Sequence, residues 1–581
     1  MYFQGIKKSI VVRPLNKKRA NLGNIHPILA HIFLARNINN PVELEKSLAL
    51  LPSPWLLSGM ENMVNELITA LKNNKRLCVV ADFDADGATS CALAIKGLQL
   101  MGFESVSFIV PNRFEYGYGL TPEIVELVKL QQPDIIITVD NGIASIEGVQ
   151  AAQHAGIKVL ITDHHLPGQQ LPNATAIVNP NLPNDRFPSK SLAGVGVIFY
   201  VLMALRSRLR ELNWFTESNI LEPNLGQLLD YVALGTIADV VSLDHINRIL
   251  VYQGLMRIRN GNCHAGLQAL INISGKNSQT IIATDLGFSL GPRLNAAGRM
   301  DDMSLGIQCL LTDDPKIANM IASQLDELNN DRREIEGQMK IEAMTLLSEM
   351  NNLNEHHLPA GICLFNANWH QGVIGILAAR IKDRINRPVI AFAPAGTDLI
   401  KGSARSIAGI HIRDILNDIA TSHPKLLSKF GGHAMAAGLS LKMHDYPAFA
   451  LVFNEFVSKH LTDVDLEQKI LSDGELSEQN ITLEFADLLQ QSSVWGQGFP
   501  EPIFHGTFEV IQSRIVGQRH LKLVVRLQNG QKLMDAIAFF IDQPEQWLGL
   551  RVITAAYKLD INEYKGQRNL QLILHYLEKN A

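Results

Sequence analysis

The stretch LCVVADFDADG, from Leu77 to Gly87, decides the fold class because it joins an apolar run directly to a cluster of carboxylates. Its first five residues are apolar, which is typical of a strand buried on both faces of a parallel sheet. Similar apolar runs follow at 107–110, 134–139, 158–162 and 174–178. The stretches between them, such as 88–101 and 121–130, are long enough for crossover helices. The pattern therefore predicts an α/β lobe built on a parallel sheet.

Polar residues follow several of these predicted strands at the point where each strand ends. They are Asp82, Asp84, Asp140 and Asp163. In an open α/β sheet the carboxyl ends of the strands line the ligand crevice. We therefore expect these side chains to gather at one edge of the sheet.

The rest of the chain predicts several further domains, since 581 residues exceed one hydrophobic core. Residues 191–310 have a mainly helical pattern, interrupted by a glycine-rich segment at 287–298. A long connecting helix is expected from Pro315 to about Met350. The pattern returns to α/β after residue 358, and strands that alternate like 521–524 and 569–572 predict a terminal OB-like β-barrel. The expected boundaries are 1–50 for an N-terminal extension, 51–310, 311–354 for the connecting helix, 355–462 and 463–581.

Composition excludes few classes of protein. The chain is 46% hydrophobic with a net charge of −5, which does not by itself indicate nucleic-acid binding. No apolar run approaches the roughly 20 residues of a membrane helix. The five cysteines form no CxxC pair, which favours reduced thiols in the cytoplasm. The first five residues, MYFQG, resemble an expression scar and are set aside.

The carboxylates of the DFDADG segment predict a metal site, because clustered negative charges are unfavourable unless a cation neutralises them. A solvated acidic loop or a helix cap would explain this segment equally well if it stood alone. Asp140 after a second strand, and His164 and His165 after a third, weaken that alternative, although a histidine pair is often only a satisfied core pair. Asp239 adds a carboxylate within an otherwise apolar segment.

The set of ligands indicates the type of ion. Carboxylates with imidazole and no thiolate favour Mn²⁺ or Mg²⁺. The number of candidate ligands is enough for two ions that share a bridging carboxylate. Such a pair activates a water molecule for attack on phosphorus.

Four segments, DFDADG, VDNG, DHH and GTIADVV, occur in the order of the motifs of the DHH phosphoesterase family, which this chain resembles. The segment GGHAMAAG at 431–438 is similar to its DHH-associated domain. The segments WHQGVIG at 369–375 and GPRLNAAGR at 291–299 resemble its RecJ branch. The resemblance runs from about residue 50 to the end and is specific as a set of motifs.

The resemblance implies roles for the metal ligands. Asp84, Asp140, His164 and Asp239 would hold one ion, and Asp82 the second, with Asp140 bridging. His165 would face the scissile phosphate. One position departs from the small-substrate members of the family, since Cys78 stands where they usually carry a histidine ligand. This favours the RecJ branch and implies a less richly liganded second ion.

Substrate-binding residues are expected from the same comparison. Ser403 and Arg405 place a hydroxyl and a guanidinium two residues apart among small residues, which suits a terminal phosphate. A surface turn with a salt-bridged arginine is the alternative. The resemblance assigns this segment to the DNA 5′-phosphate. The other residues expected to bind substrate are His433, Arg113, Arg293, Asn295 and Gln371.

The terminal domain combines aromatic and basic residues, as single-strand-binding grooves do. The aromatics are Trp495, Phe499, Tyr557 and Tyr564, and the basic residues are Lys522, Arg526, Lys558, Lys565 and Arg568. Most of these aromatics would equally suit a barrel core.

Together these features predict a single-stranded-DNA-specific 5′→3′ exonuclease that releases 5′-mononucleotides with two Mn²⁺ or Mg²⁺ ions. The alternatives are an oligoribonuclease or cyclic-dinucleotide phosphodiesterase of the same family, and a catalytically inactive DNA-binding scaffold on the same fold. The scaffold alternative predicts lost metal ligands, whereas all of them are present in this sequence. The resemblance also implies action in DNA repair and recombination. It implies a cytoplasmic monomer that works with a single-strand-binding protein and a helicase.

Overall fold

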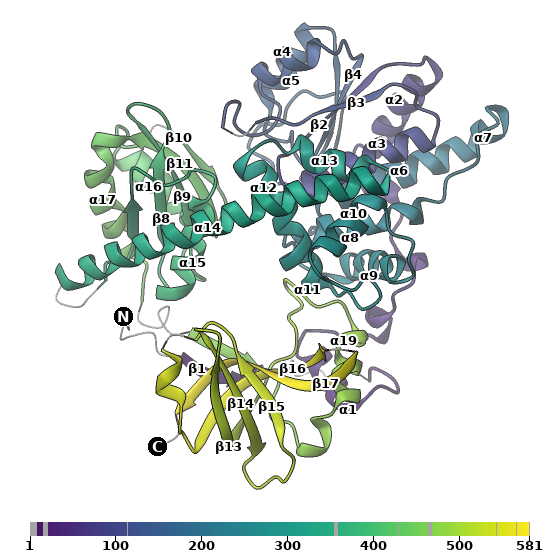
Figure 1. Cartoon of the computed structure of the whole chain (residues 1–581). Coiled ribbons are helices and arrows are strands. Elements are labelled where there is room, and N and C mark those ends of the chain that lie inside the picture. Colours follow the sequence, from purple (N-terminus) through teal and green to yellow (C-terminus); the bar gives the residue numbers. More distant parts are fainter. Residues whose placement is uncertain are drawn as a thin grey trace. The chain divides into compact units, whose positions relative to one another are not determined.

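The computed structural model describes residues 8–15, 21–112, 114–353, 358–427, 429–462, 468–541, 543–564 and 566–579. The chain forms two compact units. One comprises Met1–Val12 and Asn330–Ser472, and the other Arg13–Asn329 and Asp473–Ala581. The expected long helix is confirmed as α14 (Pro315–Leu353), which contributes residues to both units (Figure 1). No described helix is both long and apolar enough to cross a membrane.

The larger unit contains the predicted parallel sheet, in the strand order β3-β2-β4-β5-β6. Every residue of β2 and β4 is buried, which explains their continuous apolar sequences. The strands are β2 (Leu77–Ala81), β3 (Val106–Ile109), β4 (Ile135–Val139), β5 (Lys158–Thr162) and β6 (Ala176–Val178). The α/β fold class is confirmed.

Helices cover both faces of this sheet. One face packs against α4 (Pro122–Lys129) and α5 (Ile146–His154). The other packs against α2 (Met60–Lys72), α3 (Ala85–Leu100) and α6 (Gly194–Glu211). The following helices are α7 (Trp214–Glu217), α8 (Leu229–Ala238), α9 (His245–Arg259), α10 (Ala265–Ile273), α11 (Ala283–Asp285), α12 (Gly291–Met300) and α13 (Ser304–Leu311).

The glycine-rich segment at 287–298, which was predicted to interrupt the helical pattern, is itself helical. Residues Leu286–Leu290 form a π-helical turn that continues into α12. A glycine is required at position 298, because a Cβ on Gly298 would lie 2.0 Å from the carbonyl oxygen of Phe83. Glycine lets α12 pack directly against the DFDADG segment.

The β-domain belongs to the same unit. Its strands pair in a closed ring, in the order β13-β14-β15-β17-β16. Their bounds are β13 (Phe504–Val516), β14 (His520–Leu527), β15 (Met534–Ala538), β16 (Val552–Tyr564) and β17 (Gln567–Lys579). The helices α1 (Pro27–Leu34) and α19 (Leu483–Ser492) contribute to the same continuous core as the ring.

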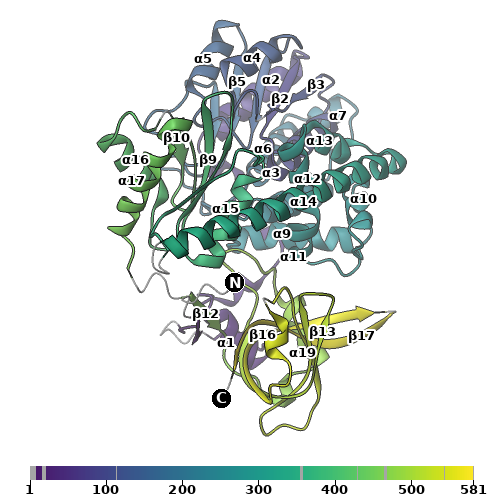
Figure 2. The same ribbon diagram turned by 60° about the vertical axis from the view of Figure 1, so that its left-hand side comes forward.

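The smaller unit is built on a mixed sheet, in the order β10-β11-β9-β8-β7. Its strands are β7 (Ile362–Phe365), β8 (Val389–Pro394), β9 (Leu399–Arg405), β10 (Lys429–Gly432) and β11 (Ala436–Lys442). Figure 2 shows α16 (Ile412–Ser422) and α17 (Tyr446–Ser458) on one side of this sheet and α15 (Ile374–Ile385) on the other. A short parallel pair, β1 (Lys8–Val12) and β12 (Gln468–Ser472), completes the unit.

Candidate metal centre

The DFDADG turn presents two carboxylates beyond the end of β2. Asp82 is buried, and Asp84 caps α3 by accepting hydrogen bonds from the backbone nitrogens of Asp86 at 2.9 Å and Gly87 at 3.1 Å. A Cβ at Gly87 would lie 2.3 Å from the carbonyl oxygen of Asp82, so only glycine permits this turn. The helix-cap alternative therefore accounts for one oxygen of Asp84, and Asp82 remains directed toward Asp140.

Asp140 ends β4 in a strained conformation. Its φ of 61° is left-handed, which is uncommon for a residue other than glycine. Such strain is concentrated at functional sites, where surrounding structure enforces it. Side-chain oxygens of Asp82, Asp84 and Asp140 all lie within 4.8 Å of one another, as the parallel-strand argument predicted.

His164 brings an imidazole to the same place. Its Nε2 atom lies 3.1 Å from Oδ1 of Asp140 and 3.5 Å from Oδ2 of Asp239, which ends α8. Both of these carboxylate oxygens are buried and lack a hydrogen-bond partner among the described residues. Two buried oxygens and one imidazole nitrogen that converge in this way fit the ligand sphere of a divalent cation.

Electrostatics strengthen that fit. Burial, followed by the charges of Asp86, Asp84 and Asp82, raises the pKa of both Asp140 and Asp239 well above the usual range. Ionised carboxylates at these positions are therefore unfavourable without a compensating charge. Because the donors are oxygens and imidazole nitrogen, the site suits Mn²⁺ or Mg²⁺.

Asp86, the third carboxylate of the turn, has a structural role as a helix cap. Its side chain accepts hydrogen bonds from the backbone nitrogens of Gly194 at 2.6 Å and Val195 at 3.0 Å, which caps α6. Burial and the charge of Asp84 raise its pKa to about 7, against the lowering effect of these hydrogen bonds. Asp86 thereby fastens α6 beside the carboxylate cluster.

Asp163 supports the histidine pair, a role that the sequence analysis did not assign. Its carboxylate accepts hydrogen bonds from the backbone nitrogens of Ile143, His164 and His165, and lies 2.7 Å from Nδ1 of His165. Burial raises the pKa of Asp163, but the hydrogen bond and charge of His165 outweigh it and lower the pKa. A carboxylate directly after an apolar strand was the signal available in the sequence.

Tyr118 is a second residue that sequence reasoning missed. Its hydroxyl lies 3.3 Å from the carbonyl oxygen of Asp140 and 3.3 Å from both ring nitrogens of His165. The two rings meet edge to face. Tyr118 lies in the loop after β3, where no apolar period or motif distinguishes it.

Arg293 and Asn295, expected to bind substrate, have contacts within α12 and its surroundings. Asn295 Oδ1 accepts a hydrogen bond from the backbone nitrogen of Ala85 at 2.8 Å, at the start of α3. Arg293 forms an ion pair with Asp326 at 2.8 Å and donates to the carbonyl oxygen of Ser289. Both therefore support the wall beside the metal centre, and contact with substrate stays a prediction.

The smaller unit holds the other predicted substrate residues. Arg405 Nη1 donates to Ser403 Oγ at 3.0 Å and to the carbonyl oxygen of Ala404 at 2.8 Å. Gly375, at the start of α15, packs against them, since its Cβ would lie 2.9 Å from Arg405 Nη2 and 3.0 Å from Ser403 Oγ. His433 lies in the turn between β10 and β11, and Gln371 is half-buried just before α15. Arg113 lies outside the described residues.

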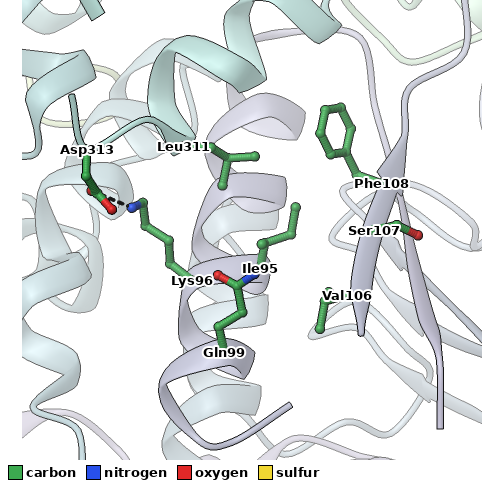
Figure 3. Close-up of a pocket in the computed structure, with 8 residues that line it drawn as sticks. All are labelled: Ile95, Lys96, Gln99, Val106, Ser107, Phe108, Leu311 and Asp313. Atoms are coloured by element: carbon green, nitrogen blue, oxygen red, sulfur yellow. Dashed lines mark hydrogen bonds and ion pairs between the residues drawn. The ribbon is translucent and has the colours of Figure 1, made fainter. Parts of the chain in front are cut away.

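A cavity of about 480 Å³ is separate from these residues (Figure 3). It lies between the second half of α3 and β3, an edge strand, and an ion pair of 2.8 Å joins Lys96 to Asp313 at its rim. Its lining residues are Ile95, Lys96, Gln99, Val106, Ser107, Phe108, Leu311 and Asp313. It contains none of the candidate ligands.

Three family models match the chain. They are the DHH family N-terminal domain over residues 76–236, the DHHA1 domain over 359–459 and the RecJ OB domain over 472–576.

Curated proteins show the same similarity along nearly the whole chain. The single-stranded-DNA-specific exonuclease RecJ of Salmonella typhimurium is 52% identical, and the alignment covers 95% of this chain and 96% of that protein. The protein of the same name from Escherichia coli is 50% identical, over 94% of this chain and 95% of that one.

Solved structures agree. RecJ from Thermus thermophilus in complex with Mn²⁺ matches with a TM-score of 0.79 and 29% identity, covering 96% of this chain and 76% of that one. The same protein in complex with Mg²⁺ matches with a TM-score of 0.72 and 28% identity, covering 96% of this chain and 75% of that one.

Proposed function

This chain belongs to the RecJ exonucleases of the DHH family, and we propose that it degrades single-stranded DNA from the 5′ end to 5′-mononucleotides. The observation that carries the proposal is the convergence of His164 Nε2 with buried oxygens of Asp140 and Asp239 that have no hydrogen-bond partner among the described residues. An active centre of this kind needs its full ligand set, and every proposed ligand lies in the described part of the chain.

The ligand set divides between two ions in the proposal. Asp84, Asp140, His164 and Asp239 would hold one ion and Asp82 the other, and Asp140 would contribute to both. Bound Mn²⁺ or Mg²⁺ would supply a water molecule of lowered pKa and would offset the negative charge of the phosphate. The protein's part is to hold four carboxylates together with His164 against the mutual repulsion of the carboxylates. The caps made by Asp84 and Asp86 and the enforced backbone of Asp140 support this arrangement.

The reaction is the hydrolysis of the terminal phosphodiester. A water oxygen attacks phosphorus, the bond to the 3′-oxygen of the terminal nucleotide breaks, and that oxygen takes up a proton. His165 is positioned by Asp163 and Tyr118, and we assign it to the scissile phosphate. A protonated imidazole there would donate to a non-bridging phosphate oxygen.

The 5′ polarity is assigned to the smaller unit. Ser403, Arg405 and His433 are proposed to bind the 5′-phosphate, because a guanidinium beside a hydroxyl forms charge-assisted hydrogen bonds to phosphate oxygens. The close packing of α15 against Ser403 and Arg405 supports a phosphate site here. The first turn of α15 brings backbone N–H groups near Arg405, and such groups bind anions. The further substrate-binding residues of the proposal are Gln371, Arg293, Asn295 and Arg113.

The wider role follows from the same premise. The proposed domains are a DHH catalytic domain over 51–310, the connecting helix over 311–354, a DHH-associated domain over 355–462 and a nucleic-acid-binding domain over 463–581. The protein would act in DNA repair and recombination as a cytoplasmic monomer. A single-strand-binding protein and a helicase are its proposed partners.

A direct assay separates this function from its rivals. With Mn²⁺, the protein should release mononucleotides from a 5′-phosphorylated DNA strand and leave a blunt duplex intact. Preference for di- to tetraribonucleotides or for cyclic dinucleotides would favour the small-substrate phosphodiesterase instead. Binding of DNA without turnover under these conditions would favour the inactive scaffold.

A further inference from the structure

Asn141 follows the proposed bridging ligand Asp140 in the VDNG segment, and its side chain joins two strands of the parallel sheet. The residue is fully buried, and its amide nitrogen Nδ2 donates hydrogen bonds to the carbonyl oxygens of Val80 at 3.0 Å and Val139 at 2.9 Å. Val80 belongs to β2 and Val139 to β4. Both acceptors are carbonyl oxygens, so only a group with two donor hydrogens, such as this amide, serves both.

The two acceptors lie where β2 and β4 lead into the candidate ligands. Val139 directly precedes Asp140, and its carbonyl oxygen also accepts a hydrogen bond from the backbone nitrogen of Asp82 at 3.3 Å. Val80 lies two residues before Asp82. A single amide therefore bonds to both strand ends at the point where carboxylate oxygens of Asp82 and Asp140 come within 4.8 Å of each other.

The backbone of Asn141 is fixed as firmly as its side chain. Its carbonyl oxygen accepts a hydrogen bond from Oγ1 of Thr138 at 2.7 Å, and a Cβ at Gly142 would lie 2.5 Å from the same Oγ1 atom. Asp140, whose φ of 61° is left-handed, thus lies between two fixed neighbours. Because a residue other than glycine keeps such a conformation only where its surroundings enforce it, the bonds of Asn141 are a direct source of that constraint.

A buried amide that joins two carbonyl oxygens can also be a purely structural clasp, and the same unit contains one. Asn247 of α9 is fully buried and donates to the carbonyl oxygens of Ser191 at 2.6 Å and Ser242 at 2.9 Å. Like Asn141, it has a side-chain oxygen with no hydrogen-bond partner among the described residues. Neither of its acceptors is next to a candidate ligand in the chain, so the location of the acceptors is what distinguishes Asn141.

We propose that Asn141 is a positioning residue for the metal centre, whose amide holds Asp82 and Asp140 at the separation that two ions sharing Asp140 require. This rests on the proposed function for the assignment of the ligands to two ions. In that assignment the second ion has only Asp82 and the shared Asp140, whereas the first has three further ligands. A shift of the end of β2 against the end of β4 should therefore weaken binding of the second ion far more than of the first.

Mn²⁺ binding to the metal-free full chain, measured by isothermal titration calorimetry without DNA, tests the proposal. The unaltered protein should bind two ions. Asn141→Ala should weaken binding of the second ion by roughly ten- to a hundredfold, the usual effect of removing a partner that orients a metal ligand. Asn141→Leu, which fills the space but donates no hydrogen bond, should show the same loss.

Two further variants separate positioning from a general loss of packing. Asn247→Ala removes an amide with the same burial and the same number of hydrogen bonds. It should lower the midpoint of urea unfolding to a similar extent and leave both Mn²⁺ affinities unchanged. Thr138→Val keeps the shape of the side chain but removes the hydrogen bond to the carbonyl oxygen of Asn141. It should weaken binding of the second ion in the same direction, and it decides the question if neither Asn141 variant folds.

A kinetic measurement distinguishes Asn141 from a metal ligand. The Mn²⁺ concentration that gives half-maximal cleavage should rise for Asn141→Ala by the factor found in the titration, while saturating Mn²⁺ should largely restore the rate. Loss of a ligand, as in Asp140→Asn, should not be restored in this way.

The outcomes for this proposal and for the proposed function are distinct. If folded Asn141 variants bind both ions as tightly as the unaltered protein, or if Asn247→Ala loses the second ion equally, Asn141 is a structural clasp and the proposal fails. Cleavage of DNA by the unaltered protein would still uphold the proposed function in that case. If the unaltered protein binds two ions in a manner that depends on Asn141 but cleaves no DNA, the proposed function fails and the positioning role stands. Binding of a single ion by the unaltered protein would overturn the two-ion assignment and this proposal with it.

Discussion

The Nδ1 atom of His165 lies 2.7 Å from Oδ1 of Asp163, whose carboxylate also receives three backbone hydrogen bonds. Burial lowers the pKa of His165, but the hydrogen bond and charge of Asp163 outweigh it and raise the pKa to about 9. In the metal-free protein this histidine is therefore protonated at neutral pH. In the proposed function, a proton held on His165 would be available to a phosphate oxygen.

Replacement of Asp163 tests this pair. Asp163→Asn should return the pKa of His165 toward its ordinary value near 6.5. Because the folded pKa exceeds the unfolded one, the stabilisation is complete below about pH 6.5 and is lost as pH rises through about 9. The variant should thus lose about 1.5–3 kcal/mol of unfolding free energy at pH 6 and less at pH 10. An NMR titration of His165 in EDTA, with urea unfolding at both pH values, measures this, and an unchanged titration would contradict it.

Asp140 should be both indispensable for cleavage and unfavourable for stability. Its carboxylate is buried among Asp86, Asp84 and Asp82, which raise its pKa together with burial. Asp140→Asn should therefore raise the melting temperature of the metal-free protein while reducing cleavage to background. Mn²⁺ at about 100 times its dissociation constant should stabilise the unaltered protein by about 2.7 kcal/mol.

The stabilising effect of Mn²⁺ provides the control for this prediction. In Asp140→Asn the gain in melting temperature on adding Mn²⁺ should shrink or vanish, because the ligand that we propose to be shared is lost. Calorimetric scans with EDTA and with Mn²⁺ measure both effects. Near-normal turnover by the variant would rule out Asp140 as the bridging ligand.

The convergence of the candidate ligands could be predicted from the sequence for a physical reason. In a parallel sheet each strand ends at the same edge, so Asp82 after β2, Asp140 after β4 and His164 after β5 had to converge if the strands were identified correctly. The resemblance in motif order then added the roles. The apolar strand pattern and the order of the motifs therefore both predicted that the candidate ligands lie at one edge of the sheet.

Other features depended on contacts between distant parts of the chain. Asp86 caps α6 by accepting a hydrogen bond from the backbone nitrogen of Gly194, 108 residues later in the chain. The sequence alone could not distinguish this capping role of Asp86 from the roles of the neighbouring aspartates.

Trp495 and Phe499 became core because α1, far away in sequence, packs against them. Composition could suggest aromatic and basic residues in the β-domain, but only the fold shows that Tyr557 is also buried in its core. The side chain of Tyr564 and all of Lys565 lie outside the described residues.

Arg405 should discriminate between strand ends. If its guanidinium binds the 5′-phosphate, Arg405→Ala should slow digestion of 5′-phosphorylated strands about ten- to a hundredfold more than of 5′-hydroxyl strands, since such a bond contributes about 1.5–3 kcal/mol. Single-turnover rates on the two substrates measure the difference. Arg413→Ala removes an exposed arginine of α16 in the same unit and should change neither rate. Equal slowing of both substrates by Arg405→Ala would place Arg405 elsewhere in the reaction.

The β-domain is held to the N-terminal segment by a buried ion pair. Arg36 donates two hydrogen bonds to Asp473, of 2.7 Å and 3.0 Å, and donates to the carbonyl oxygens of Ile32 and Pro500. Its guanidinium also lies 5.3 Å from the ring of Trp495. The side chains of Arg36 and Asp473 are only 1% and 0% exposed. Asp473 also lies 3.6 Å from Nε of Arg13, so Arg36 is not its sole cationic neighbour. Removal of the Asp473 carboxylate leaves the buried guanidinium of Arg36 without its counter-charge.

Asp473→Asn should therefore lower the unfolding free energy by about 3–5 kcal/mol. The exposed pair of Arg568 and Asp487 provides a matched control in the same domain, and Asp487→Asn should cost less than about 1 kcal/mol. Midpoints of urea unfolding compare the two variants, and equal small shifts would show that the buried pair contributes little.

The same contact predicts that deletion of residues after about 465 exposes Arg36 and Phe33 and causes aggregation. Point variants at exposed positions of the β-domain, which leave this ion pair intact, are consequently the sound way to measure what the β-domain contributes to DNA binding.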